Sequence, residues 1–387
     1  MHDAIAYIHD AADALQAERA PSDELGRLTD EAVAIMRASG GMRLMQACSH
    51  GGAEADPRVF FEWTRAVGRY NPAAGWVAGV VGVHPYEVAL ADPKLQEEIF
   101  TDPETWIASP YAPMGRATRR DDGFVLTGKW QYSTGTDHSD WVVLGGLVID
   151  GDTGSGPPDF RHFFLPRSDY EIIEDSWHVM GLEGTGSKEV HVDGSFVPEY
   201  RTMSHNELAD GAYGSRRADS AVFQLPFGCM FSAAIASATF GIAEGTLAAY
   251  REYMASRVSA MGVVGATDPF QQQALAEAEA DLAAGVTHVD AMIGEWLDRI
   301  ARGEAITPSD RLEFRRNQTR AVQRVITAID VLMTRAGSAA VWTTNPIEKY
   351  WRDLRTAGTH VCNGVDTVYT SWADDAFETG NPIRTFH

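Results

Sequence analysis

The feature that most constrains the fold is a change of residue type in the middle of the chain. From about residue 105 to 200, β-branched and aromatic residues gather in short runs, such as 124–126, 141–144 and 162–165. Turn-forming clusters separate the runs, and no stretch long enough for a crossover helix lies between them. Parallel strands need such crossovers. The pattern therefore predicts several antiparallel strands and disfavours a parallel Rossmann-type sheet.

Helical periodicity dominates on both sides of this stretch. Asn71 followed by Pro72 is typical of a helix start and leads into the apolar segment 73–83. After residue 226, apolar residues follow one face in 275–300 and again in 310–335. Long helices with one apolar stripe usually pack as a bundle.

We therefore expect an α+β protein in three parts. An N-terminal helical domain is predicted over 1–104, a β-barrel-like antiparallel domain over 105–205, and a C-terminal four-helix bundle over 206–387. The polar stretch 201–222 is predicted to be a loop, long enough to suggest a function or an interface.

Composition excludes several classes of partner. Among 387 residues there are 32 Lys and Arg against 54 Asp and Glu, for a net charge of −22, which disfavours nucleic acid and anionic membranes. Cys48, Cys229 and Cys362 are far apart, and no histidine spacing fits a metal, so neither a disulfide framework nor a metal site is expected.

No signal peptide is apparent. The apolar run 73–83 is about half the ~20 residues of a membrane span. We expect a cytoplasmic protein.

Two common catalytic signatures are missing from the sequence. It contains no Gly-rich dinucleotide fingerprint and no G-x-S-x-G elbow. The chain is therefore not expected to bind NAD(P)H itself or to act as a serine hydrolase.

A helix near the end of the chain carries the strongest motif. Residues 346–353 read P-I-E-K-Y-W-R-D. This resembles the final helix of acyl-CoA dehydrogenases, in which the pattern P-x-E-K-x-x-R-D precedes a catalytic Glu. The position of that Glu holds Val361 here, and His360 stands just before it. Arg352 and Asp353 are expected to form an ion pair that packs the helix. The missing carboxylate argues against dehydrogenation of a thioester.

Further segments resemble acyl-CoA dehydrogenases in general, and others resemble one group of proteins with that fold. Residues 125–135 and 181–187 resemble the strand and the turn that line the flavin in acyl-CoA dehydrogenases. Residues 82–84, 109–115 and 130–141 resemble the oxygenase components of two-component flavin monooxygenases. The phenol hydroxylases of that family include 3-hydroxy-seco-steroid hydroxylase and p-hydroxyphenylacetate hydroxylase.

This resemblance implies a reaction and its participants. Reduced flavin, as FMNH2 or FADH2, would come from a separate NAD(P)H:flavin reductase and react with O2 to a C4a-hydroperoxyflavin. The oxygenase would then hydroxylate a phenolic or polycyclic aromatic substrate. The resemblance also implies a homotetramer with flavin bound across a subunit contact.

Five residues are candidates for contact with the substrate. His84 would take the proton of a phenol, because imidazole titrates near neutrality. Ser109 would hydrogen-bond the substrate hydroxyl, and Tyr111 and Met114 follow it in a loop fixed by two prolines. His360, beside the position of the lost Glu, would orient the substrate or hold the oxygenated flavin.

The flavin is expected against the strand that contains Trp130, Gln131, Tyr132 and Ser133, with the Ser133 hydroxyl near flavin N5. Because side chains alternate along a strand, only one set of these four can face the ring.

The flavin phosphate is expected near three residues of the C-terminal part, Arg257, Gly337 and Ser338. These are the weakest candidates, because surface arginines and loop glycines are common in any sequence.

Three other hypotheses stay open at this point. An acyl-CoA dehydrogenase or oxidase would need another carboxylate, for which Glu244 is a candidate. A monooxygenase of the same fold could oxidise nitrogen or sulfur instead of carbon. A flavin-scaffold protein without enzymatic activity is the third.

Overall fold

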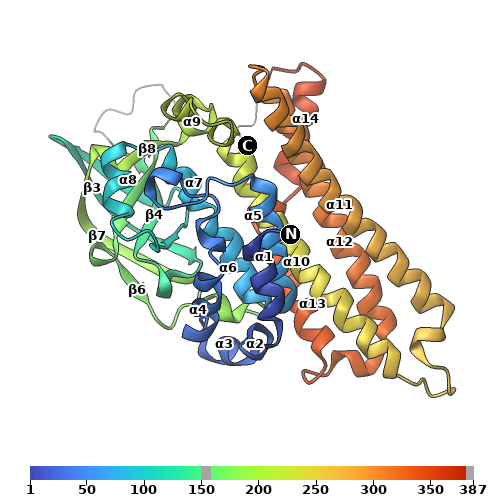
Figure 1. Cartoon of the computed structure of the whole chain (residues 1–387). Helices are drawn as coiled ribbons and strands as arrows, with labels where there is room; N and C mark the ends of the chain where they lie inside the picture. Colours follow the sequence, from blue (N-terminus) through green and yellow to red (C-terminus); the bar gives the residue numbers. More distant parts are fainter. Residues whose placement is uncertain (150–157, 381–387) are drawn as a thin grey trace.

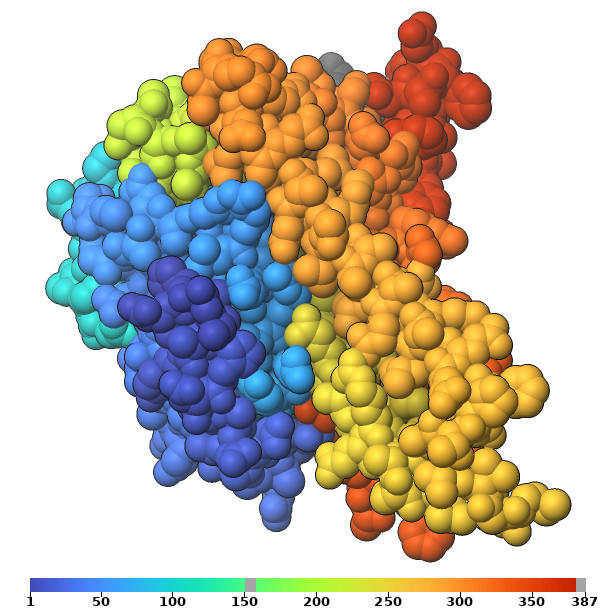
Figure 2. Space-filling view, turned by 45° about the vertical axis from the view of Figure 1, so that its right-hand side comes forward, coloured from blue at the N-terminus to red at the C-terminus, as the bar shows by residue number. Residues whose placement is uncertain are grey.

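The sheet and the long helices lie on opposite sides of the molecule, with the N-terminal helices between them (Figure 1). This computed structural model describes residues 1–149 and 158–380. Figure 2 shows the N-terminal helices and the bundle from another side, with the far end of the bundle projecting away from the rest.

The first part of the chain is helical, as predicted. Its helices are α1 (Asp3–Asp10), α2 (Ala12–Ala17), α3 (Arg19–Leu25), α4 (Asp30–Ala38), α5 (Pro57–Tyr70), α6 (Pro72–Gly82), α7 (His84–Ala89) and α8 (Pro93–Ile99). The Asn71 side chain accepts a hydrogen bond from the N–H of Ala74 at 3.1 Å and caps α6, with Pro72 in the first turn. Pro57 and Pro93 start α5 and α8 in the same way, each after an aspartate cap.

The middle part forms one sheet. Its strands are β1 (Ile107–Ala108), β2 (Gly115–Arg120), β3 (Gly123–Ser133), β4 (Trp141–Val148), β5 (Phe160–Pro166), β6 (Glu171–Ile173), β7 (Lys188–Pro198) and β8 (Thr202–Ser204). Their order is β6-β7-β3-β2-β4-β5-β8, with β1 beside β4.

The sheet is mainly but not wholly antiparallel, which corrects the sequence-based expectation. β4 pairs in parallel with both β1 and β2. After the β2–β3 hairpin the chain crosses to the free edge of β2, and because β4 runs opposite to β3 it runs parallel to β2. This crossing is made without a helix, so the lack of crossover helices did not exclude parallel pairs here. The sheet is still not of the Rossmann type, because its other neighbouring strands pair antiparallel.

Helices return after the sheet. They are α9 (His205–Ala209), α10 (Phe227–Ser256), α11 (Pro269–Ala301), α12 (Pro308–Ala336), α13 (Pro346–Ala357) and α14 (Asp366–Ala376). The predicted loop 201–222 is wrong in part, because it contains β8, α9 and a short 3-10 helix, Ala212–Arg217. α10 is long and apolar enough to cross a membrane by length and composition, but 94% of its most apolar window is buried inside the protein.

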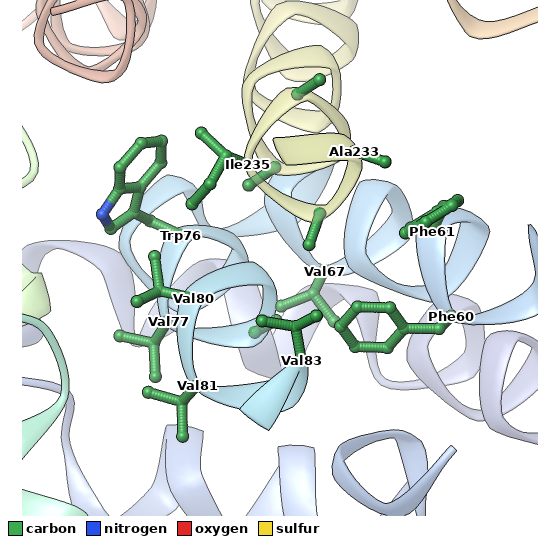
Figure 3. Close-up of a cluster of buried hydrophobic side chains, with 14 of the residues drawn as sticks. Phe60, Phe61, Val67, Trp76, Val77, Val80, Val81, Val83, Ala233 and Ile235 are labelled. Carbon is green, nitrogen blue, oxygen red and sulfur yellow. The ribbon is translucent and has the colours of Figure 1, made fainter. Parts of the chain in front are cut away.

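The contact of α10 with α5 and α6 forms the centre of the core. Phe60 and Val67 of α5 and Trp76 of α6 lie around the α10 residues Ala233 and Ile235 (Figure 3). Glycines bring the backbones together. A Cβ on Gly75 of α6 would stand 2.2 Å from Cα of Gly68 in α5, and one on Gly79 of α6 would stand 2.9 Å from the carbonyl oxygen of Ala234.

We predict that Gly75→Ala destabilises the protein by about 2 kcal/mol or more, because the methyl group meets backbone atoms that cannot turn aside. Gly294→Ala in α11 is the matched control. Its methyl group meets only the end of the flexible Arg58 side chain, so the helix propensity of Ala should stabilise the protein by up to about 1 kcal/mol. Urea unfolding of both variants measures the difference, and equal effects would contradict the packing argument.

Candidate active site

A cavity of about 600 Å³ lies where the three parts of the chain meet. α6, α10, the loop after β1, the end of β3, the turn before β7 and the segment after α13 all contribute to its wall. The lining residues are Trp76, Val80, Ser109, Pro110, Tyr111, Ala112, Gln131, Tyr132, Thr134, Trp177, Val179, Leu182, Ser187, Phe231, Thr356, Thr359, His360 and Val361.

The wall contains no carboxylate among the residues that the structure describes. Val361, at the position of the dehydrogenase Glu, is 78% exposed at the edge of the cavity. Glu244, the alternative base, lies in a separate hollow with Arg69 and Arg251, and burial raises the pKa of its carboxyl. Neither position supplies the proton-abstracting group that a thioester dehydrogenase needs.

His360 has a fixed orientation in this wall. Its ring meets Trp76 edge-on, with centroids 5.5 Å apart. Its Nδ1 accepts the N–H of Cys362 at 3.1 Å, so the neutral ring carries its hydrogen on Nε2. Burial, aided by the charge of Arg315, lowers the pKa of His360 to about 4. At neutral pH the side chain is therefore an uncharged hydrogen-bond donor.

His84 lies one side chain behind the wall. It is fully buried as the first residue of α7, and its ring contacts those of Tyr111 and Phe231, both of which line the cavity. The Tyr111 hydroxyl is 2.8 Å from Nδ1 of His84. Nε2 of His84 is buried and has no hydrogen-bond partner among the described residues. Burial lowers the pKa of His84, so the imidazole is neutral near pH 7.

The loop after β1 places some of its candidates on the wall. Ser109, 7% exposed, and Tyr111 line the cavity. Met114 is 59% exposed and lies outside the wall. Ser109, Tyr111 and His360 thus surround one space, with His84 directly behind it.

The end of β3 departs from simple alternation. The register between β3 and β7 shifts between Trp130 and Ser133, and Tyr132 has a φ of 68°. Such a bulge aims consecutive residues to one side, and both Gln131 and Tyr132 line the cavity. Trp130 instead lies in the core of the sheet, with its indole N–H donating to the carbonyl of Gly145 at 2.8 Å. Ser133 is fully buried off the wall, and its hydroxyl has no hydrogen-bond partner in the part of the chain that the structure describes.

Sequence reasoning missed several residues of the wall. Trp177 stands edge-on to Tyr132, with ring centroids 6.1 Å apart. The hydroxyls of Thr134 and Ser187 are 2.8 Å apart at another part of the wall. Trp76 gave no separate signal, because it lies in a helix that is apolar on all sides. Thr134 and Ser187 belong to the recognised segments 125–135 and 181–187, so only their roles were open.

That turn is fastened to α13 by charged groups. The buried Asp353 carboxylate accepts the N–H of Leu182 at 2.6 Å and pairs with Lys349. Lys349 also reaches Glu183 at 2.8 Å. Arg352 pairs with Glu183 and Glu348. Both Arg352 and Asp353 thus pack the helix, as expected, but the predicted pair between them is wrong.

The phosphate candidates meet at the end of the bundle. Arg257 follows the last residue of α10, and Gly337 follows α12 with a φ of 84°. A Cβ on Gly337 would stand 2.8 Å from Nη2 of Arg257, so a residue with a side chain would displace the guanidinium. Ser338 begins the next short helix. None of the three lines the cavity.

Comparison with known proteins decides the family. A model described as acyl-CoA dehydrogenase, C-terminal domain, matches residues 233–364. The chain is 40% identical over 374 residues to a pigment production hydroxylase of Rhodococcus erythropolis, covering 95% of this chain and 94% of the relative. It is 37% identical over 361 residues to the flavin-dependent monooxygenase oxygenase subunit HsaA of Mycobacterium tuberculosis, covering 92% and 90%. The chain belongs to the family of flavin-dependent monooxygenase oxygenase subunits.

Solved structures agree with this assignment. The 3-HSA hydroxylase of Rhodococcus sp. RHA1 superimposes with a TM-score of 0.92 at 32% identity, covering 100% of this chain and 98% of that one. XiaF of Streptomyces, solved with FADH2 and glycerol, gives a TM-score of 0.91 at 26% identity, covering 99% and 97%.

These comparisons confirm the expected acyl-CoA dehydrogenase-like α+β fold, the use of reduced flavin and the need for a separate reductase. The chain is an enzyme of the flavin monooxygenase class.

We predict that Asp353→Ala destabilises the protein by about 3 kcal/mol, because it leaves Lys349 and the N–H of Leu182 without their buried partner. Arg355→Ala, which breaks an exposed pair with Asp330 on the same helix, should cost less than about 1 kcal/mol. Urea unfolding compares the two variants. Equal losses would show that the fastening of the turn contributes little.

Proposed function

We propose that this enzyme hydroxylates a phenolic or polycyclic aromatic compound, using O2 and reduced flavin delivered by an NAD(P)H-dependent reductase. The single observation that carries the proposal is the cavity wall, which is aromatic and without a carboxylate, with a neutral buried histidine directly behind it. A cytoplasmic location, where NAD(P)H is available, is part of the proposal.

The cavity fits a flavin ring. Its volume of about 600 Å³ lies within the common range for ligand sites. Tyr132 and Trp177 supply aromatic surface, and Gln131, Thr134 and Ser187 supply polar groups for the edge of the ring. When bound there, reduced flavin supplies the activation of dioxygen. We propose that Arg257, Gly337 and Ser338 hold the flavin phosphate of a neighbouring copy. Whether that flavin is FMN or FAD stays open.

The side chains of the wall have complementary roles. His84 accepts the phenol proton at Nε2, which becomes accessible when the ring of Phe231 turns aside. Ser109 orients the substrate hydroxyl. His360 donates a hydrogen bond from Nε2 toward the reacting oxygen. The buried Trp76, Val80 and Phe231 keep water out, which protects the oxygen transfer.

We predict that the purified enzyme, given chemically reduced FMN or FAD, incorporates one atom of ¹⁸O2 into a phenolic substrate from a panel of mono- and polycyclic phenols. His84→Gln should lower the rate at pH 7 by about 100-fold, the usual scale of a general base. Mass spectrometry of the products measures both. Direct bleaching of oxidised flavin by an acyl-CoA, or oxygen transfer only to amines or sulfides, would contradict the proposal.

Homotetramer formation is the second part of the proposal. Exposed apolar side chains occur at one end of the bundle, in the connection from α10 to α11, at the start of α11 and after α12. They include Met261 at 88%, Phe270 at 67% and Trp342 at 68%. Exposed apolar patches of this kind mark contact surfaces. The same end carries Arg257 and Gly337, so a neighbouring copy seated there would meet the proposed phosphate site.

We predict that Met261→Asp combined with Trp342→Asp dissociates the tetramer and weakens flavin binding, because both depend on this contact. Phe377→Asp, which replaces a side chain that is 79% exposed beyond α14, is the matched control and should leave the assembly intact. Analytical ultracentrifugation and flavin titration measure the two effects. A wild-type protein that is monomeric while hydroxylating normally would refute this part.

A further inference from the structure

A connected row of titratable side chains runs from the cavity wall toward the surface. The Tyr111 hydroxyl hydrogen-bonds Oε2 of Glu87 in α7. Oε1 of Glu87 is 2.6 Å from Nδ1 of His162 in β5. Nε2 of His162 is 3.1 Å from Nδ1 of His205 in α9. Four separate segments of the chain contribute to this row.

The middle of the row is sealed from water and its outer end is not. The side chains of Glu87 and His162 are 0% exposed. His205 is partly exposed, and its ring stacks on Phe160 with centroids 4.1 Å apart. A buried carboxylate is costly unless it is compensated. Burial raises the pKa of Glu87, but the facing His162 and the hydrogen bonds outweigh this effect and lower it well below the usual value.

The charge of Glu87 fixes the direction of each hydrogen bond. A carboxylate only accepts, so Tyr111 donates its O–H to Oε2 and His162 donates from Nδ1 to Oε1. The Tyr111 oxygen can then accept from Nδ1–H of His84. A neutral His84 with hydrogen on Nδ1 has a bare Nε2. That nitrogen is the buried atom without a partner.

We propose that Tyr111, Glu87, His162 and His205 form a proton relay that sets the tautomer of His84, takes up the substrate proton and connects the sealed site to solvent. The inference rests on the proposed function, because it concerns the proton of a phenolic substrate. The groups facing Glu87 are His84 on its own helix, Tyr111 and His162, and His205 lies beyond His162. The thiol of Cys362 also acts electrostatically on Tyr111.

The relay moves protons and no electrons. The phenol O–H bond breaks, and its proton bonds to Nε2 of His84. The proton on Nδ1 of His84 passes to the Tyr111 oxygen as the Tyr111 O–H proton passes to Oε2 of Glu87. The negative charge has then moved from Glu87 to the phenolate, and the net charge of the site is unchanged. Because the pKa of Glu87 is low, this state is short-lived and is consumed by the oxygen transfer. The reverse passage returns a proton to the oxygen of the product.

The branch through His162 and His205 serves exchange with solvent. His205 is uncharged at neutral pH, because burial and the facing His162 lower its pKa to about 3. A proton that enters from solvent at His205 passes from its Nδ1 to Nε2 of His162 while the Nδ1 proton of His162 moves to Oε1 of Glu87, and the reverse movement lets it out again. The site can thus equilibrate its proton count with the outside while water stays out of the cavity.

Tyr111→Phe and Glu87→Gln test the inner relay. Each should slow hydroxylation at pH 7 by 10- to 100-fold, within the range for lost acid–base catalysis. The loss should shrink as the pH rises toward about 10, where a phenol ionises unaided. A merely structural defect would not follow the ionisation of the substrate. The measurement is product formed per second from reduced flavin, O2 and a phenol, between pH 6 and 10.

The chain offers matched controls. Tyr86→Phe removes another buried hydroxyl, that of the residue just before Glu87. The Tyr86 hydroxyl donates a hydrogen bond to the carbonyl of Leu225 at 2.7 Å. Glu244→Gln removes a largely buried carboxylate in the separate hollow. Both should keep the wild-type pH profile. If wild type makes no hydroxylated phenol, the proposed function fails. If wild type hydroxylates and both relay variants match it at every pH, the relay alone fails.

His205→Gln tests the outer branch at a partly exposed position. Its hydroxylation rate at pH 7 should fall three- to tenfold, and imidazole added to the solution should restore part of it. The solvent deuterium isotope effect should rise above that of wild type. His191 in β7 is also a partly buried histidine, and the control variant His191→Gln should change none of these quantities. An unchanged rate and isotope effect in His205→Gln would refute the outer branch, and this readout stands even if the inner variants fail to fold.

Discussion

The close contact of α10 with α5 and α6 is the constraint on which the rest of the structure depends. Glycines in α5 and α6 let the helix backbones approach to distances that a single methyl group would prevent. α10 is a bundle helix and also carries Phe231 into the cavity wall, while α6 carries Trp76 and Val80. The bundle and the wall therefore share one packing contact. A shift in that contact would change the shape of the cavity, because interiors are close-packed and transmit strain.

The polar chemistry of the site is distributed in an unusual way. The wall is apolar and aromatic, with hydroxyl, amide and imidazole groups but no charge among the described lining residues. The buried carboxylate of Glu87 lies behind Tyr111 and accepts a hydrogen bond from His162. A charge placed there influences proton transfer without attracting water into the cavity. This arrangement suits an oxygen-transfer reaction that must stay dry.

Much of the fold could be predicted from the sequence. Asn71–Pro72 specifies a helix start by capping chemistry, and the apolar stripes of α11 and α12 specify a bundle. The parallel pairing of β4 could not be predicted, because strand order depends on where the chain crosses and not on residue type. The loop 201–222 was mispredicted, since its short helices depend on tertiary contacts such as those of Gln224 with the carbonyls of Gly214 and Arg217. The bounds of the three domains stay predictions.

The candidate site was predictable only where a motif marked it. Ser109, Tyr111 and His360 were recognised by resemblance and do line one cavity. The bulge at Tyr132 was not foreseeable from alternation. Glu87 and His162 gave no signal, because a single Glu in a helix and a single His in a strand are ordinary residues until the fold joins them.

The exposed position of Val361 limits any return to dehydrogenase chemistry. A glutamate placed there would point largely into water at the rim and would ionise like a free carboxyl group. It would be neither desolvated nor aimed at a substrate carbon. The backbone after α13 is held by the cap that His360 makes to Cys362, so redesigning this protein as a dehydrogenase would require rebuilding the whole segment and not one side chain.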